Sequence, residues 1–305
     1  MASLKSTAGS LIQGSLVASS KRAYAQAVWK YHEFVLHYFK GYNAFPVKDQ
    51  LILPYIAMLF QADMSPVSVK SHLSAINFIN KAICGKDIYN FWVTKIMSGY
   101  TKLCPPSPDT RLPITTPELY KLCRAVDALY PPGGLHIMLK TMFLLSFHAF
   151  LRVGEITVSS SSTPNPNLLQ LANVSVLPHS NKVNITFTKF KHSSSHPVHL
   201  SIVSPPGPYS LFNSLLKYLS FRGMSPGPLF IFNNSPVTRK FYTMQLKNCL
   251  QCAGLNPQRY KTHSFRIGAA TSAITNGHTQ EQVQLMGRWR SGAFRKYIRI
   301  QSFTT

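Results

Sequence analysis

A proline-rich segment, residues 104–113 (CPPSPDTRLP), sets the strongest limit on how this chain can fold. It places four prolines in ten residues, and a proline inside a helix removes a backbone donor and clashes with the preceding turn. No helix can therefore run from the first part of the chain into the second. Since the chain has 305 residues, each part can bury a core of its own. We predict a flexible tail at 1–15, a first domain at 16–103, a linker at 104–113 and a second domain at 114–305.

Apolar residues in the first domain recur at steps of three and four, the period of an amphipathic helix. In residues 19–38 this spacing joins Tyr24, Val28 and Tyr31. Another helix is expected to follow Ser65, a residue type that caps helices, with Pro66 at the first helical position. The pattern predicts a small basic domain of helices at 19–38, 50–61, from Pro66 onward and at 88–103.

The second domain combines helical spacing with one stretch of strand-like alternation. A strand is predicted at 183–190, where Val183, Ile185 and Phe187 alternate with polar residues as in a half-buried strand, and shorter strands are predicted at 174–177 and 198–203. Helical patterns occupy most of the remaining sequence, at 116–129, 135–150, 210–221, 238–253, 263–275, 279–286 and 292–300. We therefore predict a mainly α protein whose second domain is α+β with one small antiparallel sheet.

The balance of charge points to a polyanionic partner. The chain holds 32 Lys and Arg against 9 Asp and Glu, a formal net charge of +23. Such an excess is most simply explained by nucleic acid, although a generally basic protein would also adhere to anions. Glu281 is the only acidic residue beyond position 155. Paired-carboxylate hydrolases and two-metal nucleases are therefore excluded, because their sites need several carboxylates.

Metal, disulfide and membrane signals are weak. The five cysteines are scattered and odd in number, which favours reduced thiols. Cys249 and Cys252 have the spacing of zinc ligands, but no second pair follows and both lie in a helical pattern. The longest apolar run, 137–151, contains Lys140 and His148 and is too short to span a bilayer. We expect a soluble intracellular protein without bound metal and without membrane contact.

Residues that suit phosphate chemistry lie at two places in the second domain. His263 and Arg266 are three apart, so on a helix they share one face at its amino-terminal end, where backbone N–H groups also point. In a chain this basic, the same pair also arises by chance. Arg152 ends an apolar helical pattern, so its guanidinium needs an anion or an acid, and Glu155 is the nearest acid. The residue types therefore suggest, without proving, a phosphate site.

Three segments, AFLRVGEI, THSFRIGAATSAITNGHTQEQVQLMGRW and SGAFRKYIR, resemble the catalytic boxes of the tyrosine recombinases, the phage-integrase family. The likeness is greatest to the branch carried by eukaryotic mobile elements of the DIRS and Crypton kinds. The segments SSKRAYAQAVWKYHEF and SPVSVKSHLSAINFINKA are similar to that family's SAM-like, helical core-binding domain, which binds DNA. The resemblance thus covers most of the chain and implies a recombinase catalytic domain at 114–305.

The resemblance implies a role for each matched residue. Arg152 and Arg266 would bind the scissile phosphate, with Glu155 in support, and Tyr297 would attack it to form a 3′-phosphotyrosine. His263 would assist the nucleophile or the phosphate. Trp289 stands where many members have a second histidine; Tyr297 follows it by eight residues, where bacterial and phage members usually have nine. The general acid would be Lys191, with Lys189 as the alternative.

The resemblance also implies partners and competing functions. The reaction exchanges one phosphodiester for another, so neither metal, ATP nor another cofactor is expected. Strand exchange needs several protomers on double-stranded DNA, in a tetramer. A catalytically silent DNA-binding descendant and a type IB topoisomerase are the alternatives. A eukaryotic origin would place the protein in the nucleus, and any other origin in the cytoplasm. The residues expected to contact DNA are Lys21, Arg22, Lys70, Lys189, Arg288 and Arg290.

Overall fold

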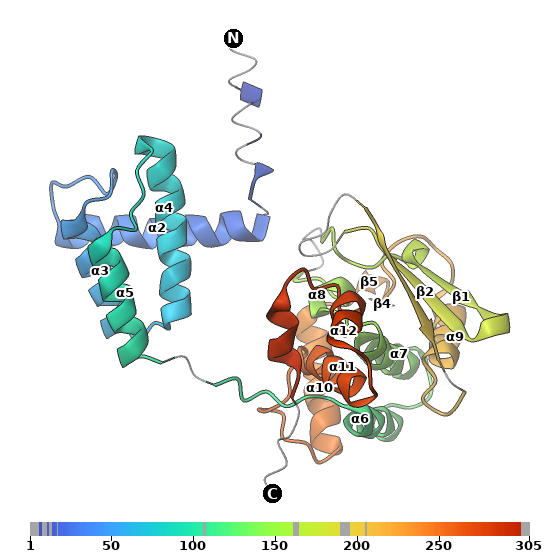
Figure 1. Cartoon of the computed structure of the whole chain (residues 1–305). Coiled ribbons are helices and arrows are strands. Elements are labelled where there is room, and N and C mark those ends of the chain that lie inside the picture. The colour runs from blue at the N-terminus through green and yellow to red at the C-terminus, as the bar shows by residue number, and fades with distance from the viewer. Residues whose placement is uncertain are drawn as a thin grey trace, which may run out of the picture. The chain divides into compact units, whose positions relative to one another are not determined.

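The computed structural model of the chain describes residues 6–7, 11, 14–16, 18–105, 108–160, 165–189, 196–204 and 206–299. The chain forms two compact units, Met1–Asp109 and Thr110–Thr305, and Figure 1 labels the helices and strands within each of them. The boundary lies in the proline-rich segment, where the backbone cannot continue a helix. Among the described residues, no helix has both the length and the hydrophobicity that a membrane span requires.

The first unit is a helical bundle. Its helices are α2 (Ala18–Tyr38), α3 (Asp49–Gln61), α4 (Pro66–Cys84) and α5 (Phe91–Leu103). Helix α4 packs across α2, and α3 packs against α5 (Figure 1). The caps set the bounds: Ser65 accepts a hydrogen bond from the Ser68 N–H at 3.2 Å, and Asn90 accepts one from the Val93 N–H at 3.0 Å. The last helix therefore begins at Phe91, a few residues later than its apolar pattern predicts.

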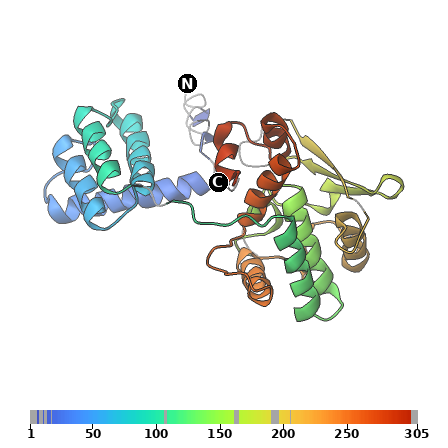
Figure 2. The same cartoon turned by 60° about the horizontal axis from the view of Figure 1, so that its bottom comes forward.

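The second unit is mainly helical with a small sheet beside it. The three-stranded sheet has the order β1–β2–β3, is antiparallel throughout, and contacts α9 through β2 (Figure 2). The predicted class, mainly α with a small antiparallel sheet, is confirmed. The elements are α6 (Thr116–Leu129), α7 (Gly134–His148), α8 (Val153–Ile156), η1 (Leu171–Asn173), β1 (Val174–Leu177), η2 (Pro178–Ser180), β2 (Lys182–Phe187), β3 (Val198–Val203), α9 (Leu211–Arg222), β4 (Ile231–Phe232), β5 (Ser235–Pro236), α10 (Arg239–Cys252), α11 (Ser264–Thr275), α12 (Gln280–Met286) and η3 (Gly292–Tyr297).

Strand β2 shows how the alternating pattern is used. Val183, Ile185 and Phe187 are buried and face the core, while the residues between them are half-exposed. The pattern predicted a strand as far as residue 190, but the ladder ends at Phe187, where residues 188–189 bend away. The hairpin of β4 and β5 was not predicted, because two residues a strand are too few to show a period.

Helix α11 lies at the centre of the second unit and packs against α7. Gly268 allows the chain before α6 to approach closely: a Cβ placed there would lie 1.7 Å from the Ile114 carbonyl oxygen. The same chain segment is fixed by a hydrogen bond from the Ile114 N–H to the Ser264 carbonyl, at 3.0 Å. The amino-terminal end of α11 is thereby held against the rest of the core.

The terminal segment differs from its prediction. An α-helix was expected at 292–300, but residues Gly292–Tyr297 form a 3-10 helix, which has three residues per turn. Residues three apart therefore share one edge, so Phe294 and Tyr297 face the same side. Phe294 is buried in the core, and the segment contacts α11 and α12. Burial of Phe294 thus turns Tyr297 toward α11.

Candidate active site

Arg152 stands in the turn between α7 and α8, beside Glu155. Its backbone N–H donates to Glu155 Oε2 at 2.9 Å, and its Nη1 donates to Glu155 Oε1 at 3.3 Å. The Glu155 side chain is 3% exposed, whereas that of Arg152 is 24% exposed. The carboxylate therefore holds Arg152 from inside the protein, while part of the Arg152 side chain remains exposed.

Arg266 lies on the first turn of α11 and is completely buried. Its Nη1 donates to the Phe150 carbonyl and its Nη2 to the Gly287 carbonyl. Among the described residues, nothing accepts a hydrogen bond from its Nε. Burial, together with the charges of Arg152 and Arg288, lowers the pKa of Arg266 to about 9, so the guanidinium is still charged at pH 7.

The turns that bind Arg266 have an uncommon backbone. Phe150 has φ 50°, and Arg288, directly after Gly287, has φ 56°. Positive φ is unfavourable for residues other than glycine, at a cost on the order of 1 kcal/mol, and such residues cluster at functional sites. Here the two turns aim the Phe150 and Gly287 carbonyls at one guanidinium.

The rings of His263, Trp289 and Tyr297 lie close together, and two of them lie beside the Arg266 guanidinium. The ring of Tyr297 lies 4.9 Å from that of His263 and 5.2 Å from that of Trp289, measured between centroids. The guanidinium carbon of Arg266 lies 4.0 Å from the Trp289 ring centroid and 5.9 Å from that of Tyr297. Predicted residues far apart in the sequence are therefore brought into one cluster, His263, Arg266, Trp289 and Tyr297. Arg152 lies near this cluster, since its charge lowers the pKa of Arg266.

Arg288 is placed differently from its prediction as a DNA contact. Its side chain is 2% exposed; Nη2 donates to Glu155 Oε2 at 2.8 Å and Nη1 to the Ala149 carbonyl at 3.0 Å. The guanidinium carbon also lies 3.6 Å from the centroid of the Phe187 ring. Burial lowers the pKa of Arg288, while Glu155 opposes that shift. The prediction that Arg288 contacts DNA is therefore wrong, because this side chain is buried and pairs with Glu155 inside the protein.

The two lysines predicted as candidates for the general acid follow β2 in the sequence. Lys189 is exposed, two residues after the strand ends. Lys191, predicted as the general acid, lies outside the described residues.

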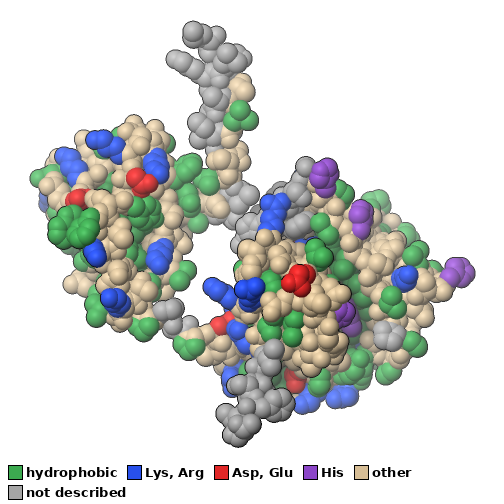
Figure 3. Space-filling model, viewed as in Figure 1, with side chains coloured by type: hydrophobic (Ala, Val, Ile, Leu, Met, Phe, Trp, Pro, Cys, Tyr) green, Lys and Arg blue, Asp and Glu red, His purple; other side chains and the backbone are tan. Residues whose placement is uncertain are grey.

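Apart from Arg288, the described residues expected to contact DNA are exposed in both units. Lys21, Arg22 and Lys70 are exposed in the first unit, and Arg290 is exposed in the second. On the face shown in Figure 3, Lys and Arg outnumber Asp and Glu in both units. These positions leave the cationic side chains accessible to a polyanion.

A basic hollow beside α10 was not predicted. It has a volume of about 610 Å³, and Arg239, Lys240 and Lys247 line it together with Ser159, Thr243 and Met244. It adjoins α8, since a Cβ on Gly154 would lie 3.4 Å from Arg239 Nη2. The spacing of Lys240 and Lys247, two turns apart on α10, was a signal in the sequence for one cationic face.

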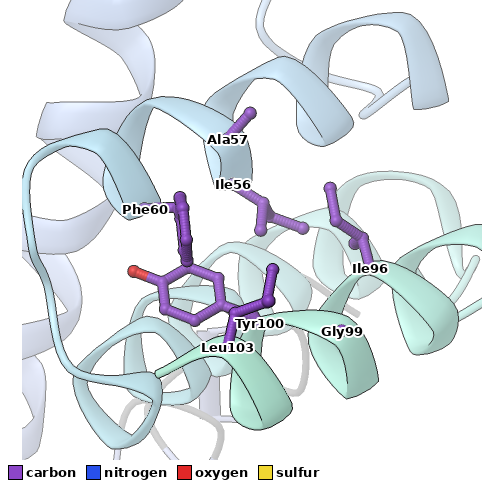
Figure 4. Close-up of a pocket in the computed structure, with 7 residues that line it drawn as sticks. All are labelled: Ile56, Ala57, Phe60, Ile96, Gly99, Tyr100 and Leu103. Atoms are coloured by element: carbon purple, nitrogen blue, oxygen red, sulfur yellow. The ribbon is translucent and has the colours of Figure 1, made fainter.

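A second hollow, of about 250 Å³, lies between α3 and α5 in the first unit (Figure 4). Its wall is apolar, with Ile56, Phe60 and Leu103 among the lining residues. The Tyr100 hydroxyl donates to the Met64 carbonyl at 2.6 Å and is thus used within the unit. This wall offers no group for phosphate chemistry.

The two cysteines considered as zinc ligands differ in their exposure to solvent. Cys249 is buried, and burial raises the pKa of its thiol to about 12, whereas Cys252 is exposed. Within the part of the chain that the structure describes, no three His, Cys, Asp or Glu side chains are grouped to hold a metal ion.

Solved structures of DNA recombinases share the fold of this chain. The XerH site-specific recombinase bound to palindromic difH substrate, in a post-cleavage complex, matches with a TM-score of 0.66 and 17% identity, over 90% of this chain and 75% of that one. A lambda integrase dimer bound to a COC′ core site matches with a TM-score of 0.61 and 14% identity, over 98% and 95%. The Tn1549 transposon integrase in complex with circular intermediate DNA matches with a TM-score of 0.54 and 10% identity, over 91% and 96%.

No protein-family model and no curated protein matches the sequence. At the identities above, the likeness is one of fold. The predicted tyrosine recombinase fold, mainly helical with a small antiparallel sheet, is confirmed.

Proposed function

We propose that this protein is a site-specific DNA recombinase that cuts and rejoins DNA through a 3′-phosphotyrosine intermediate. One observation carries the proposal: His263, Arg266 and Trp289 gather around Tyr297, the only tyrosine after Tyr260, and Arg152 lies near enough to Arg266 for its charge to lower the pKa of that residue. Nearby cations favour a phenolate and stabilise the added negative charge of a pentacovalent phosphorus.

In the proposed reaction, the Tyr297 oxygen attacks the scissile phosphorus and passes its proton to His263. A bond forms between tyrosine and the 3′-phosphate, and the bond from phosphorus to the 5′-oxygen breaks. The 5′-oxygen leaves as a hydroxyl with a proton from Lys191, or from Lys189 as the alternative. Resealing by another 5′-hydroxyl reverses these steps, so no nucleotide energy source takes part.

Access to Arg266 requires movement. Its guanidinium has no exposed surface and lies against the Trp289 ring. We propose that the phosphate first meets the accessible side of Arg152 and reaches Arg266 when the Trp289 ring moves aside. The indole N–H of Trp289 then donates to a phosphate oxygen, since an indole donates but does not shuttle protons.

Duplex DNA is the proposed substrate. Exposed cations on both units and in the hollow beside α10 would contact phosphates, and such contacts give affinity that falls steeply with salt. The similar structures include complexes with DNA and a dimer on its core site. By this likeness we propose that several protomers, in a tetramer, assemble on DNA. An origin in a DIRS- or Crypton-type transposable element, with action in the nucleus, belongs to the same proposal.

A nicked suicide duplex tests the cleavage step, because it traps the covalent intermediate. We expect a protein–DNA adduct that survives denaturation and disappears in Tyr297→Phe. Tyr120→Phe is the matched control. It makes the same change at an exposed tyrosine of the same unit, whose ring contacts that of Tyr209 and lies outside the cluster. An adduct of equal yield in Tyr297→Phe would refute the assignment of the nucleophile.

The complete burial of Arg266 favours a second candidate, a DNA-binding protein that no longer cuts. This candidate predicts a mobility shift with no adduct under any condition. A type IB topoisomerase would form the adduct but would not join two different duplexes. An assay that offers two labelled duplexes therefore separates the three functions.

A further inference from the structure

The Thr271 hydroxyl holds the backbone on both sides of the proposed nucleophile. Thr271 is buried on α11, and its Oγ1 donates to the Tyr297 carbonyl at 3.2 Å. The same Oγ1 accepts a hydrogen bond from the Arg299 N–H at 3.0 Å. One side chain thus uses its donor and an acceptor lone pair to fix the chain from Tyr297 to Arg299.

The segment that carries Tyr297 needs such support. It is a six-residue 3-10 helix, Gly292–Tyr297, and short 3-10 helices have poor hydrogen-bond geometry and little stability of their own. Within the described residues, Phe294 anchors the start of the segment by burial. At its end, Tyr297 is only partly buried, and its ring meets the rings of His263 and Trp289. Thr271 supplies directed hydrogen bonds at this end.

We propose that Thr271 is a positioning residue that holds Tyr297 beside His263 and Arg266 of the same chain. This inference rests on the proposed function. Thr271 and Arg266 belong to the same helix, so the hydroxyl ties the nucleophile to the helix that carries the phosphate ligand. These two hydrogen bonds join Thr271 to the backbone of the segment and not to the phenol of Tyr297.

Thr271→Val is the sharpest perturbation, because valine keeps the shape of threonine and removes the hydroxyl. Both hydrogen bonds are then lost, and Tyr297 is released from α11 at its backbone. Displacement of a reacting group by about 1 Å slows a reaction by roughly 100-fold. We therefore expect single-turnover adduct formation to slow by roughly 10- to 100-fold at saturating protein, with unchanged affinity for DNA.

Two companion variants separate positioning from a general structural effect. Thr271→Ser keeps the hydroxyl, so it should restore most of the rate. Thr275→Val makes the same change one turn later on α11, where the hydroxyl donates at 3.0 Å to the helix's own Thr271 carbonyl. We expect Thr275→Val to form the adduct at the wild-type rate.

The experiment measures adduct yield against time on the suicide duplex, DNA affinity and the unfolding midpoint for all four proteins. A wild-type rate in Thr271→Val, an equal loss in Thr275→Val, or no recovery in Thr271→Ser would each overturn the positioning role while the proposed function stands. If the wild-type protein itself forms no adduct, the proposed function fails and this inference fails with it.

Discussion

The buried pair of Glu155 and Arg288 gives the most quantitative prediction. The two side chains are 3% and 2% exposed, and 2.8 Å separates Arg288 Nη2 from Glu155 Oε2. Replacing Arg288 with methionine removes the closer cationic partner and leaves the carboxylate with Arg152 at 3.3 Å. Removing one partner of a buried ion pair costs about 3–5 kcal/mol when the other charge is left buried without compensation. Because Arg152 still pairs with Glu155, we expect Arg288→Met to cost about 3 kcal/mol, the lower end of that range. We expect this loss in the free energy of unfolding of the second unit.

A double-mutant cycle tests this reasoning. Glu155→Gln leaves Arg288 as the uncompensated charge, so it should destabilise by a similar amount. The double variant should cost clearly less than the sum of the two single variants, with a coupling energy of at least about 2 kcal/mol, because neither charge is then stranded. Unfolding in guanidinium chloride, followed by circular dichroism, measures the four stabilities.

The control for this cycle is Arg290→Met. It removes the same charge two residues further on, at an exposed position, and should change stability by no more than about 0.5 kcal/mol. If Arg288→Met costs no more than Arg290→Met, or if the two single losses simply add, the buried pair does not stabilise the fold as described. A further consequence concerns Arg152: in Glu155→Gln it loses its carboxylate partner, so adduct formation should slow.

Three further predictions concern acid stability, helix packing and salt. Burial lowers the pKa of His148 to about 4, whereas a histidine in an unfolded chain titrates near 6.5. Between these two pH values the unfolded state binds more protons than the folded state, so the free energy of unfolding should fall by about 2 kcal/mol from pH 7 to pH 5. In pH-dependent denaturation, His148→Gln should lack this part of the decrease. Gly268→Ala should destabilise the protein by roughly 3 kcal/mol, because the new Cβ meets the Ile114 carbonyl. Gly99 has open space around it, so Gly99→Ala should stabilise its helix by about 0.5–1 kcal/mol. Equal changes of the unfolding temperature in the two variants would contradict this reasoning. Lys247→Gln should reduce the slope of log affinity for DNA against log salt by about one, and an unchanged slope would remove the basic hollow from the DNA surface.

The sequence predicted the helices well where local chemistry sets their limits. Ser65 caps the helix that begins at Pro66, and its hydroxyl accepts from the Ser68 N–H, only three residues away. Helix α6 begins at Thr116 and ends at Leu129, the bounds that its pattern predicts. The strands β1 and β3 have the predicted bounds, since alternation along one strand is also local information. The prediction failed for β4 and β5, because two residues are too short a stretch to show the alternation of a strand. It also failed at Gly292–Tyr297, where packing of the segment produced a 3-10 helix in place of the predicted α-helix.

The residues of the candidate site were named from sequence, but their relations were not. Sequence alone showed a cationic chain with an Arg, a His-x-x-Arg, a Trp and a Tyr in a fixed order. Only the tertiary structure decided that Arg288 turns inward to a carboxylate 133 positions away, and that Thr271 holds the chain beyond Tyr297. The physical reason is that caps, turns and periodicity act between neighbours along the chain. Whether a guanidinium is buried or solvated depends on which distant groups the fold brings within hydrogen-bond reach.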